Sequence, residues 1–415
     1  MTICKIQGGV TAARGFQAAC CAAGIKYQDR RDMAMIFSSV PCKAAGTFTS
    51  NLVKAAPVIW DQAIVKGGKD VHCVVVNAGI ANAATGARGM QLCEATAEAA
   101  GKLLSVPKDS VLLGSTGVIG PNIPLDKISA GVSAMAASLS DSPEAGTAAS
   151  EAIMTTDTIN KEYAVSFELP AAEGERTVTV HIGGMSKGSG MIHPNMSTML
   201  AYLTTDCAID AELMQKALSA VVQDTFNMIS VDGDTSTNDT LLVLANGLAE
   251  NCPITEESES YRIFLEALLT VCRELAIMMA GDGEGATHLM EMHVINADTK
   301  ENARTLARSV VSSSLVKAMV YGKDANCGRI LCALGYAGPE FDPERMELYL
   351  EGNGERLCFY REGRVLEFDE DKALQLMSEK AVRFTGDMKM GTAEATAWGC
   401  DLTYDYVKIN GDYRS

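Results

Sequence analysis

Residues 70–117 contain the three segments that decide the fold class. The run DVHCVVVNAG (70–79) is apolar and rich in valine, MQLCEATAEAAGKLLS (90–105) has its apolar residues at helical spacing, and SVLLGSTG (110–117) is a second apolar run that ends in a turn. Valine-rich runs favour strands, and a 3.6-residue spacing favours an amphipathic helix. Strand, helix and strand in this order predict a mixed α/β fold.

The same alternation extends along the chain in both directions. The pattern predicts helices near 125–139, 144–154, 210–226, 237–249 and 257–280, strands near 177–185 and 287–297, and a long helix over 301–320. From about residue 340 the sequence is richer in strands, with MELYLEG, ERLCFYREG and AVRFTGDM separated by turn residues.

Length and composition limit the class of protein. At 415 residues the chain is long for one core, so two closely packed domains or one large α/β body are expected. A net charge of −17 disfavours a nucleic-acid surface, which needs clustered Lys and Arg. The sequence contains neither a membrane-length apolar run nor a signal-peptide core in MTICKIQGGV, so we expect a cytoplasmic protein.

Familiar cofactor and metal motifs are missing or incomplete. GSTGVIG (114–120) is not the GxGxxG of dinucleotide folds, no GxxxxGK[ST] or CxxC occurs, and the five histidines have no metal-ligand spacing. The spacing of Asp232, Asp234 and Asp239 resembles that of a calcium-binding loop. However, Thr237 and Val243 occupy the positions where that loop needs Gly and Glu. We therefore expect no bound metal. The thirteen cysteines are scattered along the sequence, and we expect them to be reduced thiols. A Ser-His-Asp triad is left open, although no GxSxG supports one.

A hydroxyl pair, Ser197 and Thr198, stands inside KGSGMIHPNMSTMLAYLTTD (187–206). A threonine can be a nucleophile without histidine if its own free α-amino group, with a pKa of about 7.7–8, serves as the base. Such an amine exists only if the peptide bond before Thr198 is cut. The competing interpretation is that the two hydroxyls simply cap a helix or strand.

Several long motifs resemble one family in the same order along nearly the whole chain. They include GGVTAARGFQAACCAAGIK (8–26), VVNAGIANAATG (75–86), GSTGVIG, MTTDT (154–158), SVDGDTSTND (230–239), GDGEGAT (281–287) and the terminal DLTYDYVKINGDYRS. Together with 187–206 they resemble the ornithine acetyltransferase family, also called the bifunctional ArgJ glutamate N-acetyltransferases.

This resemblance implies a fold and an activity. The expected fold is α/β with two β-sheet layers flanked by helices, as in ArgJ and DmpA proteins. Autocleavage between Ser197 and Thr198 would give an α chain, 1–197, and a β chain, 198–415, with two of each in a heterotetramer. The expected reaction moves acetyl from N2-acetylornithine to glutamate in arginine biosynthesis without a cofactor. The use of acetyl-CoA as a second donor is left open.

The resemblance also implies roles for individual residues. Thr198 matches the nucleophile, and Thr116 and Gly117 match the pair that stabilises the oxyanion. The substrate-binding positions match Thr155 (or its neighbour Thr156), Lys187, Thr198, Glu284, Asn410 and Ser415. A cation, an anion and neutral donors suit an amino acid with an α-carboxylate and a side-chain ammonium.

Three positions depart from the family pattern. His288 stands where the family has Lys, Cys327 where it has Trp, and Ile80 where it has Asn. An imidazole in place of a fixed positive charge would weaken electrostatic help to a carboxylate. The altered His288 and Cys327 keep open an uncleaved, inactive metabolite-binding relative. A related N-terminal-threonine amidase or aminopeptidase also stays open.

Overall fold

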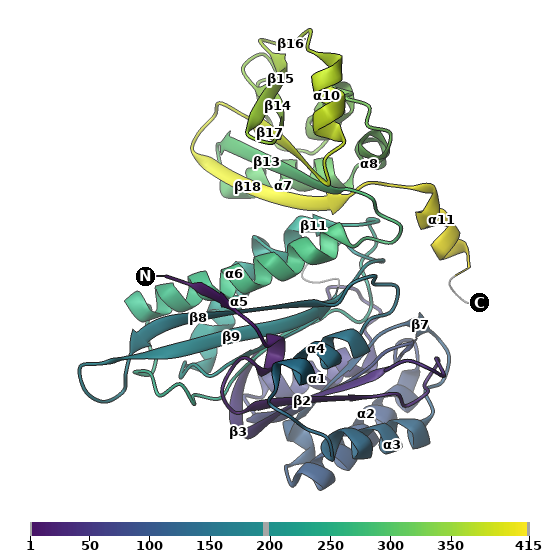
Figure 1. The fold of residues 1–415 in the computed structure, drawn as a ribbon, viewed down its shortest axis with the longest axis vertical. Coiled ribbons are helices and arrows are strands. Elements are labelled where there is room, and N and C mark those ends of the chain that lie inside the picture. The colour runs from purple at the N-terminus through teal and green to yellow at the C-terminus, as the bar shows by residue number, and fades with distance from the viewer. Residues whose placement is uncertain (1, 194–198, 413–415) are drawn as a thin grey trace. The chain divides into compact units, whose positions relative to one another are not determined.

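The computed structural model describes residues 2–193 and 199–412, which form two compact units. The first unit contains residues 2–188, 199–223 and 235–275, and the second contains 189–193, 224–234 and 276–412. Each unit has its own main sheet with helices packed on it (Figure 1). The division predicted from the sequence is a covalent cut between residues 197 and 198, which differs from the division into these two units. The cut stays a prediction.

The main sheet of the first unit has nine strands, in the order β1-β8-β9-β10-β12-β3-β4-β6, with β2 paired to β3. The strands are β1 (Cys4–Ile6), β2 (Phe16–Cys21), β3 (Met33–Phe48), β4 (Val71–Asn77), β6 (Val111–Ser115), β8 (Lys161–Pro170), β9 (Thr177–Lys187), β10 (Leu200–Thr205) and β12 (Thr240–Ala245). A two-stranded sheet joins β5 (Ile80–Ala81) to β7 (Val118–Ile119).

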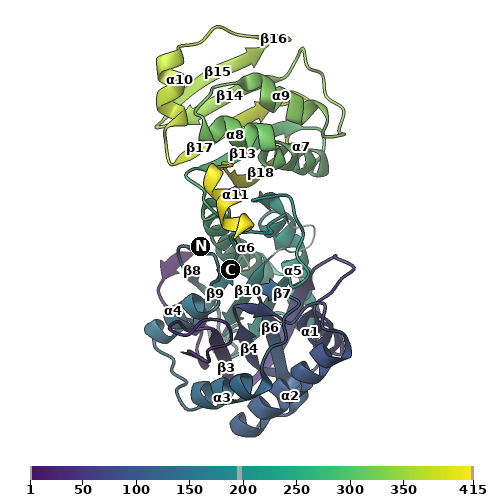
Figure 2. The same ribbon diagram turned by 90° about the vertical axis from the view of Figure 1, so that its right-hand side faces the viewer.

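Helices cover this sheet. They are α1 (Ala56–Lys66), α2 (Gly86–Leu104), α3 (Leu125–Ala136), α4 (Pro143–Ala152), α5 (Ala211–Gln223) and the first part of α6 (Glu259–Gly281), with 3-10 turns at Gly9–Thr11 and Lys108–Ser110. Helices α2 and α3 pack on each other near β3 and β4 (Figure 2).

The valine-rich run of β4 is buried on both faces. Cys73 and Val75 belong to the core cluster that includes buried residues of α2 and α3. Val74 and Val76, which point the opposite way, belong to a second cluster with buried residues of α4 and β10. Burying a valine side chain contributes roughly 1.5–3 kcal/mol. An uninterrupted apolar run fits this strand because neither face meets water.

Most predicted elements are confirmed, but the helix near 237–249 is wrong. Those residues form β12, a parallel neighbour of β10 and an antiparallel neighbour of β3. All six residues of β12 are buried. After its first residue, Thr240, the strand is a short apolar run, which has no periodicity to separate a buried strand from a buried helix. Asn246 and Gly247, which follow it, are the residues that end the strand.

The register of three neighbouring strands positions the candidate site. In the antiparallel pair β9 and β10, Lys187 lies opposite Leu200. In the parallel pair β10 and β12, Leu200 lies beside Thr240. The last residue of β9 therefore stands at the same end of the sheet as the start of β10 and β12.

The main sheet of the second unit has seven strands, in the order β11-β18-β13-β17-β14-β15-β16. They are β11 (Ile229–Ser230), β13 (Leu289–Ala297), β14 (Glu347–Gly352), β15 (Glu355–Arg361), β16 (Arg364–Val365), β17 (Ala381–Asp387) and β18 (Ala393–Cys400). The helices are the end of α6, α7 (Lys300–Ser312), α8 (Ser314–Tyr321), α9 (Cys327–Gly335), α10 (Glu370–Met377) and α11 (Tyr404–Gly411), with a 3-10 turn at Phe226–Met228.

The predicted helix over 301–320 is two helices that meet at Ser313. Helix α7 buries Ala303, Leu306, Ala307 and Val310 against β13 and β18, at the spacing expected of one helix face. Ser313 has an extended backbone and its hydroxyl accepts a hydrogen bond from the Val316 N–H, so it begins α8 as an N-cap.

The predicted α/β class with two main sheets and flanking helices is confirmed. The thirteen cysteines are free thiols. Over residues 2–193 and 199–412, no helix has both the length and the apolar character needed to cross a membrane.

Candidate active site

The turn that follows β6 contains Thr116 and Gly117, the predicted oxyanion pair. The Thr116 N–H donates to the Asn77 carbonyl (3.0 Å) and the Val118 N–H donates to the Gly79 carbonyl (3.1 Å), which fixes the turn beside the end of β4. The Thr116 hydroxyl and the Gly117 N–H take no part in these two bonds. Both residues are partly exposed, so the turn presents a hydroxyl and an N–H that suit a developing oxyanion.

Only glycine fits at position 117. Its φ is +120°, and an added Cβ would lie 2.3 Å from both the carbonyl carbon and the oxygen of Gly79. A side chain would therefore force the backbone of the turn to move away from Gly79.

Hydrogen bonds to Ser115 join two sequence motifs to this turn. The Asn82 N–H donates to Ser115 Oγ (2.7 Å), and Asn238 Nδ2 donates to the Ser115 carbonyl (2.8 Å). Ser115 Oγ donates in turn to the Ile80 carbonyl (3.2 Å). Because this bond uses the main chain of Ile80, the departure from Asn at that position leaves the support of the turn intact.

A buried carboxylate, Asp157, organises the MTTDT loop and the end of β9. Its Oδ1 accepts from Lys161 Nζ (2.8 Å) and from the Gly188 N–H (2.8 Å), and its Oδ2 accepts from the Thr155 N–H (3.0 Å). Lys187 Nζ lies 3.9 Å from the same Oδ2. The predicted substrate contacts Thr155 and Lys187 are thus held by one side chain. Sequence reasoning missed Asp157 and Lys161.

The charge state of Asp157 follows from these neighbours. Burial opposes its ionisation, but the positive charges of Lys187 and Lys161 outweigh burial and hold the pKa of Asp157 well below its usual range. Thr155 and its neighbour Thr156 are both half-buried on this loop, so the choice between them stays a prediction.

A second buried carboxyl, Asp239, lies at the start of β12. Burial raises the pKa of Asp239 well above its ordinary range. Hydrogen bonds from Ser236, Thr49 and the Met199 N–H, together with the charge of Lys187, lower this pKa, but burial outweighs them. Its Oδ2 is buried without a hydrogen-bond partner among the described residues. A neutral acid is the form that this environment favours. Asp239 is one of the three aspartates whose spacing resembles a calcium-binding loop. That spacing did not predict that Asp239 is buried.

In the second unit, the predicted contacts Glu284 and Asn410 are paired. Asn410 Nδ2 donates to Glu284 Oε2 (2.6 Å), and the Glu284 N–H donates to the Ser189 carbonyl (2.9 Å). The Glu284 carboxyl packs so closely on Gly190 that an added Cβ would lie 2.4 Å from it. The pair therefore fixes a buried carboxylate beside the glycine turn that follows β9.

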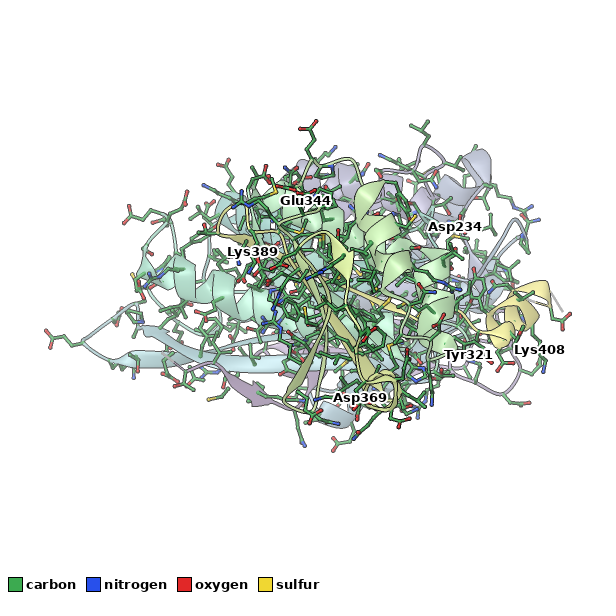
Figure 3. The ribbon with its side chains drawn as sticks, turned by 90° about the horizontal axis from the view of Figure 1, so that it is seen from above. Asp234, Tyr321, Glu344, Asp369, Lys389 and Lys408 are labelled. Atoms are coloured by element: carbon green, nitrogen blue, oxygen red, sulfur yellow. The ribbon has the colours of Figure 1, made fainter. Side chains whose placement is uncertain are left out.

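Helix α11, which carries Asn410, is fixed at its start. Thr403 caps the helix and its hydroxyl donates to the Gly285 carbonyl (2.8 Å). The ring of Tyr404 contacts Tyr321 edge to face, and Figure 3 labels Tyr321 near the helix. The bond from Thr403 to Gly285 joins the GDGEGAT motif to the C-terminal motif.

Two departures from the family pattern lie in the second unit. The Nδ1 of the buried His288 lies 2.7 Å from Thr287 Oγ1 and 3.2 Å from Asp401 Oδ2. Cys327 begins α9 as a buried residue, and burial raises the pKa of its thiol. The acidic neighbour of His288 is Asp401. The same carboxylate would be a suitable partner for the lysine that the family pattern has at this position.

Asp232 accepts hydrogen bonds from two backbone N–H groups and from a tyrosine hydroxyl. Its carboxylate accepts from the Met191 N–H (2.6 Å), the Ile192 N–H (2.8 Å) and the Tyr406 hydroxyl (3.3 Å). Within the part of the chain that the structure describes, no group of three or more His, Cys, Asp or Glu side chains could hold a metal ion.

The predicted residues thus fall into three groups: the turn with Thr116 and Gly117, the Asp157 cluster with Thr155 and Lys187, and the Glu284–Asn410 pair. Ser197, Thr198 and Ser415 lie outside the described residues. The first two groups lie in the first unit, and the Glu284–Asn410 pair lies in the second.

Comparison with known proteins shows the family. The ArgJ family model matches residues 17–415. A relative from Symbiobacterium thermophilum, described as arginine biosynthesis bifunctional protein ArgJ, is 51% identical over 412 residues, which are 99% of each chain. The chain belongs to the ArgJ family.

Two solved structures are also similar. A Bacillus halodurans structure, described as arginine biosynthesis bifunctional protein argJ, is 43% identical with a TM-score of 0.49, over 51% of this chain and 97% of that one. A Mycobacterium tuberculosis structure, described as ornithine acetyltransferase complexed with ornithine, is 39% identical with a TM-score of 0.42, over 47% of this chain and 99% of that one.

Proposed function

We propose that this protein is a bifunctional acetyltransferase of arginine biosynthesis, which acts as an ornithine acetyltransferase and as a glutamate N-acetyltransferase. The observation that carries this conclusion is the 51% identity, over 99% of both chains, to a relative described as bifunctional ArgJ. The acyl donor is N2-acetylornithine and the acceptor is glutamate.

The enzyme matures by cutting its own chain. Thr198 Oγ attacks the Ser197 carbonyl, the peptide nitrogen leaves as the Thr198 α-amine, and water hydrolyses the resulting ester. The glycines at 188 and 190 and the proline at 194 support this assignment, since such residues suit a strained scissile bond. The products are an α chain, 1–197, and a β chain, 198–415.

In the first half-reaction, the Thr198 amine takes the hydroxyl proton and Oγ attacks the acetyl carbonyl of N-acetylornithine. The Thr116 hydroxyl and the Gly117 N–H stabilise the tetrahedral oxyanion, an effect of about 3–4 kcal/mol per donor in acyl-transfer enzymes. The intermediate collapses, the proton passes to the leaving nitrogen, and ornithine departs from acetyl-Thr198.

In the second half-reaction, the amine of glutamate attacks the acetyl-threonine ester. The same donors stabilise the second oxyanion, and the Thr198 hydroxyl is restored as N-acetylglutamate leaves. No cofactor is needed for either step. Acetyl-CoA would be a second donor for the same acetyl-threonine.

The charged residues divide the recognition of substrate. Lys187 pairs with a substrate carboxylate, and Glu284 pairs with the side-chain ammonium of ornithine. Asn410, Ser415 and Thr155 supply neutral hydrogen bonds. The burial of Lys187 and Glu284 supports these roles, because charges that are largely removed from water gain most from an oppositely charged ligand.

Intact mass spectrometry tests the proposal. We expect two polypeptides, one beginning at Met1 or Thr2 and one at Thr198, and the second should gain one acetyl group on incubation with N-acetylornithine. Thr198→Ala should remain a single chain. Ser197→Ala, the matched control, should still be cut, because only the carbonyl of residue 197 is attacked.

The fate of the acetyl group separates the remaining hypotheses. Adding glutamate should remove the acetyl group and produce N-acetylglutamate, whereas rapid loss to water alone would identify an amidase. An uncut wild-type chain would refute the mechanism and favour the inactive relative. Native mass spectrometry would test for two α and two β chains in one assembly.

A further inference from the structure

Asn238 bonds to the oxyanion turn from the segment that precedes β12. Its Nδ2 donates to the carbonyl of Ser115 (2.8 Å), the residue that is followed directly by Thr116 and Gly117. The Thr237 hydroxyl donates to Asn238 Oδ1 (2.7 Å), so both ends of the amide group are held. Asn238 is 8% exposed, and its bond to Ser115 is therefore largely shielded from water.

The next two residues, Asp239 and Thr240, hold both main-chain groups of Met199. The Asp239 carboxyl accepts from the Met199 N–H, and the Thr240 N–H donates to the Met199 carbonyl (2.8 Å). All three residues are buried. Met199 directly follows Thr198, the proposed nucleophile, so residues 239 and 240 fix the main chain beside the nucleophile.

A second set of hydrogen bonds ties this segment to the connection between β3 and α1. The Thr49 N–H donates to the Asp239 carbonyl (3.0 Å), and the Thr49 hydroxyl donates to the Ser236 carbonyl (2.7 Å). The Ala55 N–H donates to the Thr237 carbonyl (2.9 Å). Side chains carried by a segment that is tied along its length keep a fixed spacing, which is what the support of a reactive site requires.

We infer that residues 238–240 form a bridge that sets the position of the nucleophile relative to the oxyanion donors. Asn238 is the positioning residue for the turn, and Asp239 is the positioning residue for the start of β10. This inference rests on the proposed function, which assigns the nucleophile to Thr198 and the donors to the turn after β6. Because a displacement of about 1 Å between reacting groups can lower a rate about 100-fold, the bridge acts on the rates of both half-reactions.

A purely local structural role is the alternative. Each bond could matter only to the group that it touches, because a buried carbonyl or N–H without a partner is costly. The two possibilities differ in whether an effect crosses the bridge. Loss of the Asn238 donor disturbs the main chain at Met199 only if the two ends are coupled, and loss of the Asp239 carboxyl disturbs the turn only on the same condition.

The experiment compares Asn238→Asp with Asn251→Asp, its matched control. Both asparagines are buried in the first unit, and both donate from Nδ2 to main-chain carbonyls. Those of Asn251 are the carbonyls of Ala208 and Cys252, which belong to none of the three groups of the candidate site. Aspartate keeps the shape of asparagine but lacks the Nδ2 donor, so the two variants carry the same chemical change.

Rapid-quench intact mass spectrometry measures the two half-reactions separately, as acetylation of Thr198 by N-acetylornithine and as loss of the acetyl group to glutamate. In Asn238→Asp we expect both rates to fall about tenfold or more and by similar factors, because the same oxyanion donors serve both steps. KM for N-acetylornithine should stay within about threefold of wild type, since equal slowing of both steps leaves the ping-pong KM unchanged. Asn251→Asp should change each rate by less than about threefold.

Hydrogen exchange tests the bridge without turnover. In Asn238→Asp, amides in residues 199–206 should exchange faster than in wild type, although the altered side chain bonds to the turn. The reciprocal variant is Asp239→Ala, which removes the acceptor for the Met199 N–H. In that variant, amides in residues 112–119 should exchange faster. Asn251→Asp should leave both segments as they are in wild type.

Several results would overturn the inference. They are rates in Asn238→Asp that match those of Asn251→Asp, a loss confined to one half-reaction, and exchange that rises only in the segment that the altered side chain touches. If Asn238→Asp fails to fold, Asn238→Ala removes the donor without adding a charge, and Asp239→Ala tests the bridge from its other end. If the wild-type chain is neither cut nor acetylated, the proposed function fails, and hydrogen exchange alone decides the bridge.

Discussion

Gly117 lies against the Gly79 carbonyl so closely that a Cβ at position 117 would sit 2.3 Å from it. Gly117→Ala should therefore displace the N–H that we assign to the oxyanion, and we expect kcat/KM to fall by about 100-fold or more. Steady-state kinetics with N-acetylornithine and glutamate measures the loss.

Gly120→Ala is the matched control for this turn. Gly120 also has a positive φ, 106°, but nothing lies within 4 Å of an added Cβ. This variant shares the unfavourable backbone conformation without the clash, so its kcat/KM should stay within about threefold of wild type. Equal losses in the two variants would mean that general strain, rather than the contact with Gly79, controls activity.

Replacing Glu284 by glutamine should change recognition of the donor. The substitution keeps an oxygen that can accept from Asn410 Nδ2 but removes the buried negative charge. We expect KM for N-acetylornithine to rise about tenfold or more, because the side-chain ammonium loses its partner. For N-acetylnorvaline, which lacks that ammonium, wild type and Glu284→Gln should have similar KM values. An equal increase with both donors would contradict the assignment.

Asp61 provides a test of pH dependence away from the candidate site. Its Oδ1 accepts from the Leu113 N–H (2.9 Å), its Oδ2 has no partner among the described residues, and burial raises its pKa well above the ordinary range. Because the folded pKa exceeds the unfolded value, the neutral carboxyl contributes its full stability below that unfolded value. The contribution is lost as pH rises through the folded pKa.

Asp61→Asn removes this titration and keeps an acceptor for Leu113. Its free energy of unfolding should exceed that of wild type at about pH 7, and the difference should shrink as the pH falls toward about 3. Urea unfolding across this range measures the difference. A variant that is less stable than wild type by the same amount at every pH would show that the asparagine packs poorly instead.

Two neighbouring serines should differ in their contribution to stability. Ser313 caps α8, so Ser313→Ala should lower the free energy of unfolding by about 1 kcal/mol. The Ser312 hydroxyl is buried without a hydrogen-bond partner in the described structure, so Ser312→Ala should be neutral or slightly stabilising. Urea unfolding of both variants provides the comparison, and equal losses would argue against the cap.

The sequence predicted those elements whose burial leaves a periodic pattern. Helix α2 and strands β4 and β6 were found because helical spacing and valine content are local properties. Strand β12 was mistaken for a helix because both of its faces are buried, which erases the alternation that identifies a strand. The break at Ser313 was missed because serines within a helical pattern, here 312–314, resemble surface residues.

The candidate site was predicted in part, for a similar reason. Motifs indicated Lys187, Glu284 and Asn410, and the structure adds the hydrogen bond between the last two. Asp157 and Lys161 were missed as a pair because their contact depends on burial in a loop and the start of β8. Sequence spacing alone cannot distinguish such a pair from two solvated charges.

The order of strands in the first unit has a practical consequence for the proposed cut. Strands β10 and β12 would belong to the new β chain, yet they are inserted between β9 and β3, which would belong to the α chain. Neither fragment could leave without breaking hydrogen bonds along both borders of that insertion. A purification tag on either fragment should therefore recover both in equal amounts, and only a denaturant should separate them.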